Sequence, residues 1–303
     1  MSTERDLVRP DLGTEPDAAS LVRYTLGKSV RRMLHHEPGL RSGSDPEDLH
    51  QFRVATRRLR SDLRAFRAVL DRAWADTVRA DLRWLGDVIG AVRDNDVLAE
   101  RLRVQVESLG PRDAEAGALL LARLAQAGAR ARAAMLDALD SDRYDMLTET
   151  LVRAVREPVF AEGASVTGDG SAARLMTATV RHQWKRLCAG VAALPDPPAD
   201  ADLHRIRILA KRLRYATEAG LPLFGHRAAR LADAATGIQI VLGNQHDAVV
   251  AEEWLRAAAV EDPAAGVVAG QLVARNRRDA ERCGRKWPRL WRRASARRLR
   301  AWW

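Results

Sequence analysis

The chain has 303 residues, of which 47% are hydrophobic and 5% aromatic, and it carries a formal net charge of +10 at pH 7. Its two cysteines, Cys188 and Cys283, exclude a disulfide framework, and no apolar run reaches the length of a membrane span. The excess of positive charge predicts a polyanionic partner or an anionic surface.

The sequence predicts an all-α fold, because Ala and Leu abound and the alternation typical of strands is scarce. We expect a disordered N-terminal arm over residues 1–16 that does not resemble a signal peptide, which favours a cytoplasmic protein. Two helical halves follow, at 17–157 and 172–303, joined by a linker at 158–171 that is rich in Gly, Ser, Thr and Asp. Helices are expected near 17–36, 46–71, 74–108, 112–139, 142–156, 172–194, 201–219, 226–258, 264–287 and 288–301.

A basic motif occurs twice, starting at Leu49 and at Leu203, and six of the twelve aligned positions are identical. In each copy a His precedes basic residues three, seven and ten positions further on, so these side chains share one helix face. The first copy contains His50, Arg53, Arg57 and Arg60, and its stripe continues to Arg64. The second copy contains His204, Arg207, Lys211 and Arg214.

A solvated face is the ordinary interpretation of a charged helix, but residues 49–60 and 203–214 contain no acidic residue. Neighbouring like charges repel, so each stripe destabilises its own helix unless an anion lies against it. The first stripe spans roughly 21 Å at about 1.5 Å per residue, which suits an extended anionic chain better than one phosphate. We therefore predict that the two helices line opposite sides of one channel. Titration of the histidines near pH 6.5 predicts tighter binding at lower pH.

A second similarity follows each motif, with Gly90 and Asp94 matching Gly243 and Asp247 at nearly the same offset. The two matched segments indicate a duplicated domain. We expect the aspartates to orient a basic neighbour by a charge-assisted hydrogen bond, with a helix kink or cap as the alternative. His246 and Asp247 form a single pair of possible ligands, which is too few to indicate a metal centre. We therefore predict no metal, no cofactor and no catalytic residue.

The duplicated His-x-x-Arg-Val/Ile-x-x-Arg/Lys-Arg-Leu-Arg pattern, followed by Gly-x-x-Arg/His-Asp, resembles the CHAD family, the conserved histidine α-helical domain. The resemblance covers residues from about 15 to 300. It implies two helical bundles related by pseudo-twofold symmetry around a basic central cavity that binds inorganic polyphosphate, often at polyphosphate granules. Carried onto this chain, the binding residues are His50, Arg53, Arg57, Arg58, Arg60, His204, Arg207, Lys211, Arg212 and Arg214.

Weaker candidates for the same site are Lys28, Arg32, Arg93, Arg181, Lys185 and His246. Many members of the family carry a triphosphate-hydrolysing CYTH domain with a Glu-x-Glu-x-Lys signature, which this sequence lacks. We therefore expect a stand-alone, non-catalytic polyphosphate-binding protein.

Two other functions compete with polyphosphate binding. A nucleic-acid-binding protein agrees with the positive charge, but the stripes lack the interleaved aromatics of single-strand binders. A phosphohydrolase or kinase would need a Gly-rich phosphate loop or a carboxylate cluster for Mg²⁺, and neither occurs within the motifs. The basic segment 275–303 is expected to close the bundle with its tryptophans and to contribute in part to the site, and a nucleic-acid contact is the alternative.

Overall fold

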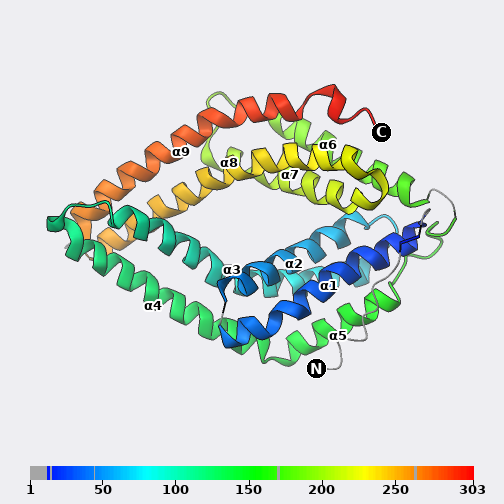
Figure 1. Ribbon diagram of the computed structural model, residues 1–303, viewed down its shortest axis with the longest axis horizontal. Helices are drawn as coiled ribbons and strands as arrows, with labels where there is room; N and C mark the ends of the chain where they lie inside the picture. The colour runs from blue at the N-terminus through cyan, green and yellow to red at the C-terminus, as the bar shows by residue number, and fades with distance from the viewer. Residues whose placement is uncertain (1–11, 14–15, 44, 169–170, 263–264) are drawn as a thin grey trace.

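The computed structural model describes residues 12–13, 16–43, 45–168, 171–262 and 265–303, and this part of the chain is all-α as predicted (Figure 1). The expected arm at 1–16 lies almost wholly outside these residues. The α-helices are α1 (Ala18–Ser42), α2 (Pro46–Ala65), α3 (Arg72–Val106), α4 (Ala114–Leu139), α5 (Asp142–Arg156), α6 (Ser171–Ala192), α7 (Asp200–Ala219), α8 (Leu221–Glu261) and α9 (Gly266–Ala294), with 3-10 turns η1 (Pro111–Asp113) and η3 (Arg297–Leu299).

The first basic motif lies on α2, whose start is set by local chemistry. The Asp45 side chain accepts the backbone N–H of Glu47 at 2.8 Å, and Pro46 occupies the first turn, where its missing N–H costs nothing. Phe52 and Leu59 on the apolar face are fully buried. The helix is therefore anchored through one side and presents its guanidinium groups on another.

The second motif lies on α7, which repeats this arrangement. The Asp202 side chain accepts the backbone N–H of Ala199 at 3.2 Å and so caps the helix start. Leu203, Ile206 and Leu213 are buried in the core on the apolar side. As on α2, burial of the apolar side fixes the direction in which the basic side chains point.

Three hydrophobic clusters hold the bundle together. The first packs α1, α2, α5 and the first half of α3, and the second packs α6 to α9. The third joins the far ends of α3 and α4 to those of α8 and α9. Since Met176 belongs to the first cluster and Val180 to the second, α6 takes part in both. The halves are thus tied together at both ends of the molecule, and α2 and α3 face α7 and α8 between them (Figure 1).

Three predicted helix ends were wrong. Helix α2 ends at Ala65, before the expected end at residue 71. Helix α1 continues through Pro38 to Ser42, and α9 continues through Pro288 to Ala294, where two separate helices were expected. A proline removes one helical hydrogen bond. In α9, Trp287 and Ala294 on either side of it are buried in the second cluster, and this packing keeps the helix continuous.

The linker is non-helical over residues 158–168, and its last residue, Ser171, begins α6. It pairs with the turn between α2 and α3, where Ala161 donates its backbone N–H to Val69 at 2.9 Å and Asp71 donates to Val159 at 2.9 Å. The domain boundaries and the duplication themselves remain predictions. Within the described residues, no helix combines the length and the apolar character needed to cross a bilayer.

Candidate functional site

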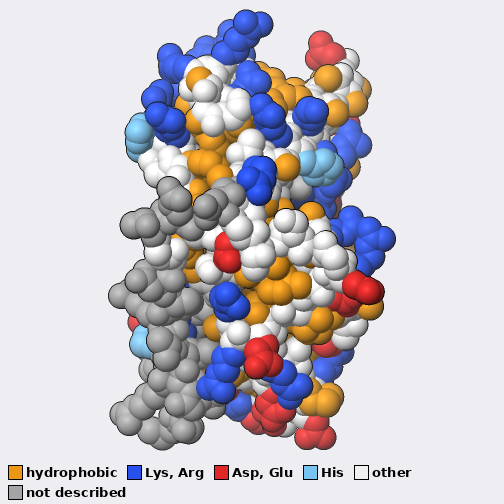
Figure 2. Space-filling model, turned by 90° about the vertical axis from the view of Figure 1, so that its right-hand side faces the viewer, with side chains coloured by type: hydrophobic (Ala, Val, Ile, Leu, Met, Phe, Trp, Pro, Cys, Tyr) orange, Lys and Arg blue, Asp and Glu red, His pale blue; other side chains and the backbone are white. Residues whose placement is uncertain are grey.

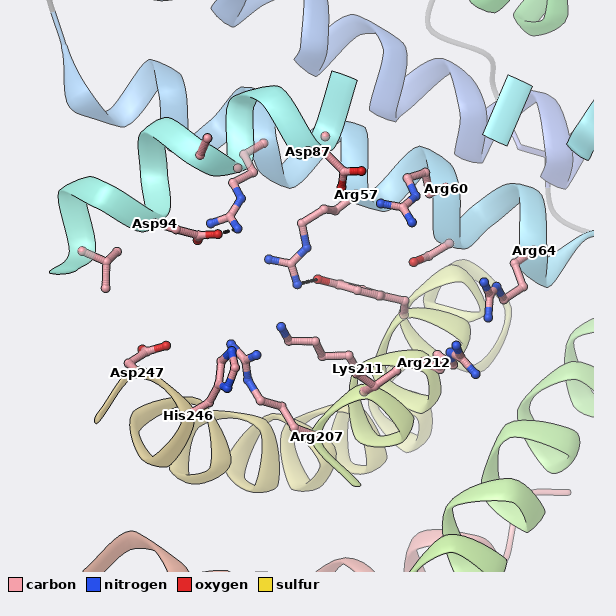
Figure 3. A pocket seen from close by; sticks show the side chains of 18 of the residues that line it. Arg57, Arg60, Arg64, Asp87, Asp94, Arg207, Lys211, Arg212, His246 and Asp247 are labelled. Atoms are coloured by element: carbon pink, nitrogen blue, oxygen red, sulfur yellow. Dashed lines mark hydrogen bonds and ion pairs between the residues drawn. The ribbon is translucent and has the colours of Figure 1, made fainter. Parts of the chain in front are cut away.

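A cavity of about 720 Å³ lies between α2 and α3 on one side and α7 and α8 on the other (Figure 3). Both motif helices contribute basic side chains to its lining, so the two stripes meet in one cavity as the spacing predicted. The side chains from α2 are Arg53, Arg57, Arg60 and Arg64, and those from α7 are Arg207, Lys211 and Arg212.

Glycines of α3 and α8 lie beside guanidinium groups of the two motif helices. A Cβ added at Gly90 would lie 3.8 Å from Arg53 Nη2, and one added at Gly243 would lie 3.6 Å from Arg207 Nε. The Gly of each Gly-x-x-Arg/His-Asp element therefore lies against the first arginine of the corresponding basic motif. The two sequence elements of each motif are therefore neighbours in space.

Few of the cavity cations have an anionic partner. Arg53 Nη2 donates to Asp94 Oδ1 at 2.8 Å, which agrees with the orienting role predicted for that carboxylate. Arg57 Nη2 donates to the Tyr215 hydroxyl at 3.1 Å, a neutral acceptor. Within the described residues no hydrogen bond or ion pair reaches the other lining cations of α2 and α7, which are Arg60, Arg64, Arg207, Lys211 and Arg212, whereas Arg79 and Arg101 of α3 are ion-paired.

Burial and mutual repulsion make this cluster unfavourable when it is empty. Burial, followed by repulsion from Arg57, Arg207 and Arg53, lowers the pKa of Lys211 to about 7. Burial and the neighbouring Arg212 lower the pKa of Arg64 to about 10. A bound anion would remove this repulsion, because an opposite charge favours the protonated form of each group.

The pKa values of the three candidate histidines are all lowered. Burial is the main cause that lowers the pKa of His50 and His204, and it lowers that of His246 to about 4. The rings of His204 and His246 lie 4.3 Å apart between centroids, and His246 alone of the three lines the cavity. All three imidazoles therefore titrate below the pH of about 6.5 expected from the sequence.

Lys211 is instead the group expected to couple binding to pH. A bound polyanion raises its pKa above the value of about 7 in the free protein, so binding at higher pH requires uptake of a proton. Affinity is full below pH 7 and falls as the pH rises, by up to about tenfold per pH unit for one linked proton. Calorimetric titrations of polyphosphate between about pH 6 and pH 9 measure this fall.

Lys211→Arg is the matched variant, because it keeps the positive charge and does not titrate in this range. Its affinity should stay nearly flat over the same pH interval. Equal pH profiles for the two proteins would show that Lys211 does not carry the linked proton.

Two residues that were predicted to bind the ligand, Arg58 and Arg214, instead form ion pairs with acidic side chains. Arg58 pairs with the buried Asp62, with 3.0 Å between Nε and Oδ1, and also with Glu218 of α7. Arg214 pairs with the same Glu218, with 2.7 Å between Nε and Oε1. These contacts join α2 to α7, and neither arginine lines the cavity.

Other sequence candidates also lie outside the cavity lining. Lys28, Arg181 and Lys185 are exposed, and exposed Arg32 donates to Gln51. The structure does not place the following candidates in the lining: His50, His204, Lys28, Arg32, Arg93, Arg181 and Lys185. Their contribution to binding remains a prediction.

The structure adds lining residues that the sequence did not single out. Tyr215 directly follows the second motif, so its position beside Arg214 was a usable signal. Arg79 and Arg101 lie on α3 among acidic residues, and no spacing rule connects them to the motifs. Arg101 is already bonded, with 2.6 Å from Nε to Asn276 Oδ1 and 3.0 Å from Nη2 to Asp279 Oδ2. Over the described residues, no three His, Cys, Asp or Glu side chains gather as metal ligands.

Solved structures similar to this chain include two helical proteins. PptA from Streptomyces chartreusis is 25% identical with a TM-score of 0.74, and the match covers 91% of this chain and 99% of that one. The CHAD domain from the plant Ricinus communis is 29% identical with a TM-score of 0.75, and that match covers 97% of this chain and 96% of the other.

Among curated sequences, the chain is 32% identical over 289 residues to the uncharacterized protein Rv2226 of Mycobacterium tuberculosis strain H37Rv. A second relative, MT2285 of strain CDC 1551, is 31% identical over the same length. Both alignments cover 89% of this chain and 52% of the relative, so the chain spans about half the length of the curated relatives it matches. The CHAD domain model matches residues 25–256. With this match over most of its length, the chain belongs to the CHAD domain family.

Proposed function

We propose that this protein binds inorganic polyphosphate in the cavity between α2, α3, α7 and α8 without chemically changing it. The observation that carries the proposal is that half-buried cations from two helices converge on one cavity, and most of them have no ion-pair partner among the described residues. Phosphate oxygens supply the missing charge. A guanidinium group also offers two parallel donors to them, which an elongated chain of phosphates can engage repeatedly.

The dimensions of the cavity favour a chain over a single phosphate. Arg53 and Arg64, both in the lining, are eleven positions apart on α2, or roughly 16 Å at about 1.5 Å per residue. The family resemblance implies the same ligand. Because binding releases counterions from a polyanion, affinity should fall steeply with salt concentration.

The residues that line the cavity support an enzymatic function less well than a binding function. Its carboxylates lie beside guanidinium groups: Asp94 is paired with Arg53, and Arg207 is the cation that acts most strongly on Asp247. The sequence has no Gly-rich phosphate loop in its motifs. We therefore assign the cations to binding and assign no residue to catalysis.

Nucleic acid is the alternative polyanion. Single-strand binders stack successive bases on several aromatic side chains, whereas Tyr215 is the one aromatic residue in the described lining. Its ring is already flanked by Arg58, with 5.7 Å from Cζ to the ring centroid, and by Arg214 at 5.2 Å. This arrangement favours a ligand without bases. Localisation in the cytoplasm or at polyphosphate granules follows from the family resemblance and remains a prediction.

A competition experiment tests the proposal. Polyphosphate is titrated into the protein at physiological salt, with and without excess single-stranded nucleic acid, and released phosphate is assayed in the same samples. We expect tight binding that nucleic acid does not displace, with no phosphate released. Displacement by nucleic acid would favour the alternative ligand, and steady phosphate release would show that the protein is an enzyme.

A further inference from the structure

Lys211 differs from every other lysine of the chain in where it lies. The sequence has four lysines, and the other three, Lys28, Lys185 and Lys286, are exposed. Lys211 is half-buried on α7, and its side chain extends toward the middle of the cavity (Figure 3). Its amine makes no hydrogen bond or ion pair within the described residues. One lysine of the four is therefore both shielded from bulk water and open to a molecule that enters the cavity.

The charges around Lys211 are mostly positive. Arg57 of α2 and Arg207 of α7 act on it more strongly than the carboxylate of Asp247 on α8 does. Together with burial, which is the largest cause, they lower the pKa of Lys211 to about 7. About half of its amine is then uncharged at pH 7, against roughly one part in a thousand for an ordinary lysine. The ionisable groups of the surrounding helices are Arg53, Arg57, Asp94, His204, Arg207, Tyr215, His246 and Asp247.

An uncharged lysine amine is a nucleophile, and its neighbours decide which molecules reach it. Proteins activate lysine by removing it from water and by placing cations beside it. Positive charge alone does not make such a site, because Lys and Arg also gather on the exposed surface, as over the upper half of Figure 2. Lys211 combines positive charge with a cavity of about 720 Å³, which lies within the range of roughly 300–1,000 Å³ for small-molecule sites.

The two neighbouring guanidinium groups have donors to spare. Arg57 donates only to the neutral Tyr215 hydroxyl among the described residues, and Arg207 has no ion pair there. Guanidinium groups bind phosphate oxygens through two parallel hydrogen bonds. A small acyl phosphate matches both parts of this site, since its phosphate suits the arginines and its activated carbonyl group suits the amine. Binding through the phosphate would hold the carbonyl carbon near the amine nitrogen.

We propose that Lys211 is a modification site, at which a small acyl phosphate held by Arg57 and Arg207 acylates the amine. The nitrogen attacks the carbonyl carbon, so that an N–C bond forms and the C–O bond to the phosphate breaks. Inorganic phosphate leaves and takes up the proton that the nitrogen loses. The product is a neutral amide, which removes one cation from the cavity. The consequence rests on the proposed function: the acylated protein binds polyphosphate more weakly.

The dependence on pH distinguishes Lys211 from an ordinary lysine. Its uncharged fraction rises as the pH rises through about 7 and is nearly complete by about pH 8, so the acylation rate should level off there. An ordinary lysine gains reactivity up to about pH 10. A less basic amine is also a weaker nucleophile, as is known for thiols. Because the gain in uncharged amine is about a thousandfold, Lys211 should still react at least about tenfold faster at pH 7.

Peptide mass spectrometry after incubation with acetyl phosphate tests the site. The full chain is treated between about pH 6 and pH 10, and the acetylated fraction of each of the four lysines is followed with time. We expect Lys211 to react first at pH 7 and its rate to level off near pH 8. A rate at Lys211 no higher than those of the three exposed lysines would overturn the inference.

Arg57→Gln tests whether the arginines select the donor. At about pH 9 the Lys211 amine is largely uncharged with or without Arg57, so the variant changes the binding of the phosphate and little else. Acetylation by acetyl phosphate should slow about tenfold, whereas acetylation by the neutral N-hydroxysuccinimidyl acetate should not change. The matched control, Arg289→Gln on the exposed face of α9, should slow neither reaction. Equal rates with acetyl phosphate in the two variants would show that Arg57 does not hold the donor.

Calorimetry with polyphosphate tests the consequence and separates it from the proposed function. The acetylated protein should bind at least about tenfold more weakly than the untreated protein. Lys211→Arg, treated in the same way, should keep its affinity, because it retains the charge and its exposed lysines still react. An equal loss in both proteins would show that Lys211 is not the group responsible. No heat from the untreated protein would remove the proposed function, while the acylation of Lys211 would stand on the mass spectra.

Discussion

Reversing the charges of Arg57 and Lys211 together, as Arg57→Glu and Lys211→Glu, is expected to abolish polyphosphate binding. The two side chains approach the middle of the cavity from α2 and α7 (Figure 3). Neither has an acidic partner within the described residues, and the exchange places two carboxylates where phosphates are proposed to bind. A loss of at least about a hundredfold, or about 2.7 kcal/mol, is expected from calorimetry at physiological salt.

The control for this experiment carries the same change in net charge on an exposed surface. Arg289→Glu and Arg292→Glu lie on exposed positions of α9. Solvent and salt screen charges at such positions, so the affinity should change little. The cavity variant should fold normally, because its new carboxylates gain Arg53 and Arg207 as neighbours. Equal losses in the two variants would show that net charge, and not the cavity, determines binding.

Arg58→Ala is expected to destabilise the fold, although Arg58 directly follows Arg57 in the motif. Its guanidinium is the cation paired with Asp62, which is fully buried, and Ser29 Oγ donates to the other carboxylate oxygen at 3.3 Å. At alkaline pH, where Asp62 is ionised, removing its partner in the buried ion pair costs roughly 3–5 kcal/mol, because the carboxylate stays buried without compensation. Urea unfolding followed by circular dichroism measures the loss.

The loss should depend on pH in a defined direction. Burial raises the pKa of Asp62 to about 7 in the folded protein, above its unfolded value. The stability that comes from the neutral carboxyl is therefore full below the unfolded pKa and is lost as the pH rises through about 7. Without Arg58 the folded pKa rises further, so the variant loses most at alkaline pH and least near pH 5, where the carboxyl is protonated.

Two comparison variants isolate the cause. Arg58→Ala with Asp62→Asn should recover much of the stability, because no buried charge is left. Arg57→Ala should weaken polyphosphate binding with little change in stability, since the Arg57 guanidinium donates only to the Tyr215 hydroxyl among the described residues. If Arg58→Ala weakened polyphosphate binding as strongly as Arg57→Ala and left the free energy of unfolding unchanged, the structural role assigned to Arg58 would be wrong.

The sequence by itself determined the helical class, most helix bounds and the two stripes. Helical spacing is a local property, so the positions of Arg53, Arg57, Arg60 and Arg64 on one face follow from the sequence alone. The expected helix ends at residues 36 and 287 lie next to Pro38 and Pro288, and the helices continue past both prolines. Packing of residues such as Trp287 outweighed the lost hydrogen bond, and no local rule contains that energy.

Only the tertiary structure decided which basic side chains share a cavity and which hold helices together. Arg57 and Arg58 are adjacent and chemically identical, yet one faces Tyr215 in the cavity and the other faces buried Asp62. Arg79 joins the site because α3 packs antiparallel to α2, and the lowered pKa of Lys211 needs charges from another helix. Burial and the approach of distant charges depend on long-range packing, which spacing along one helix cannot encode.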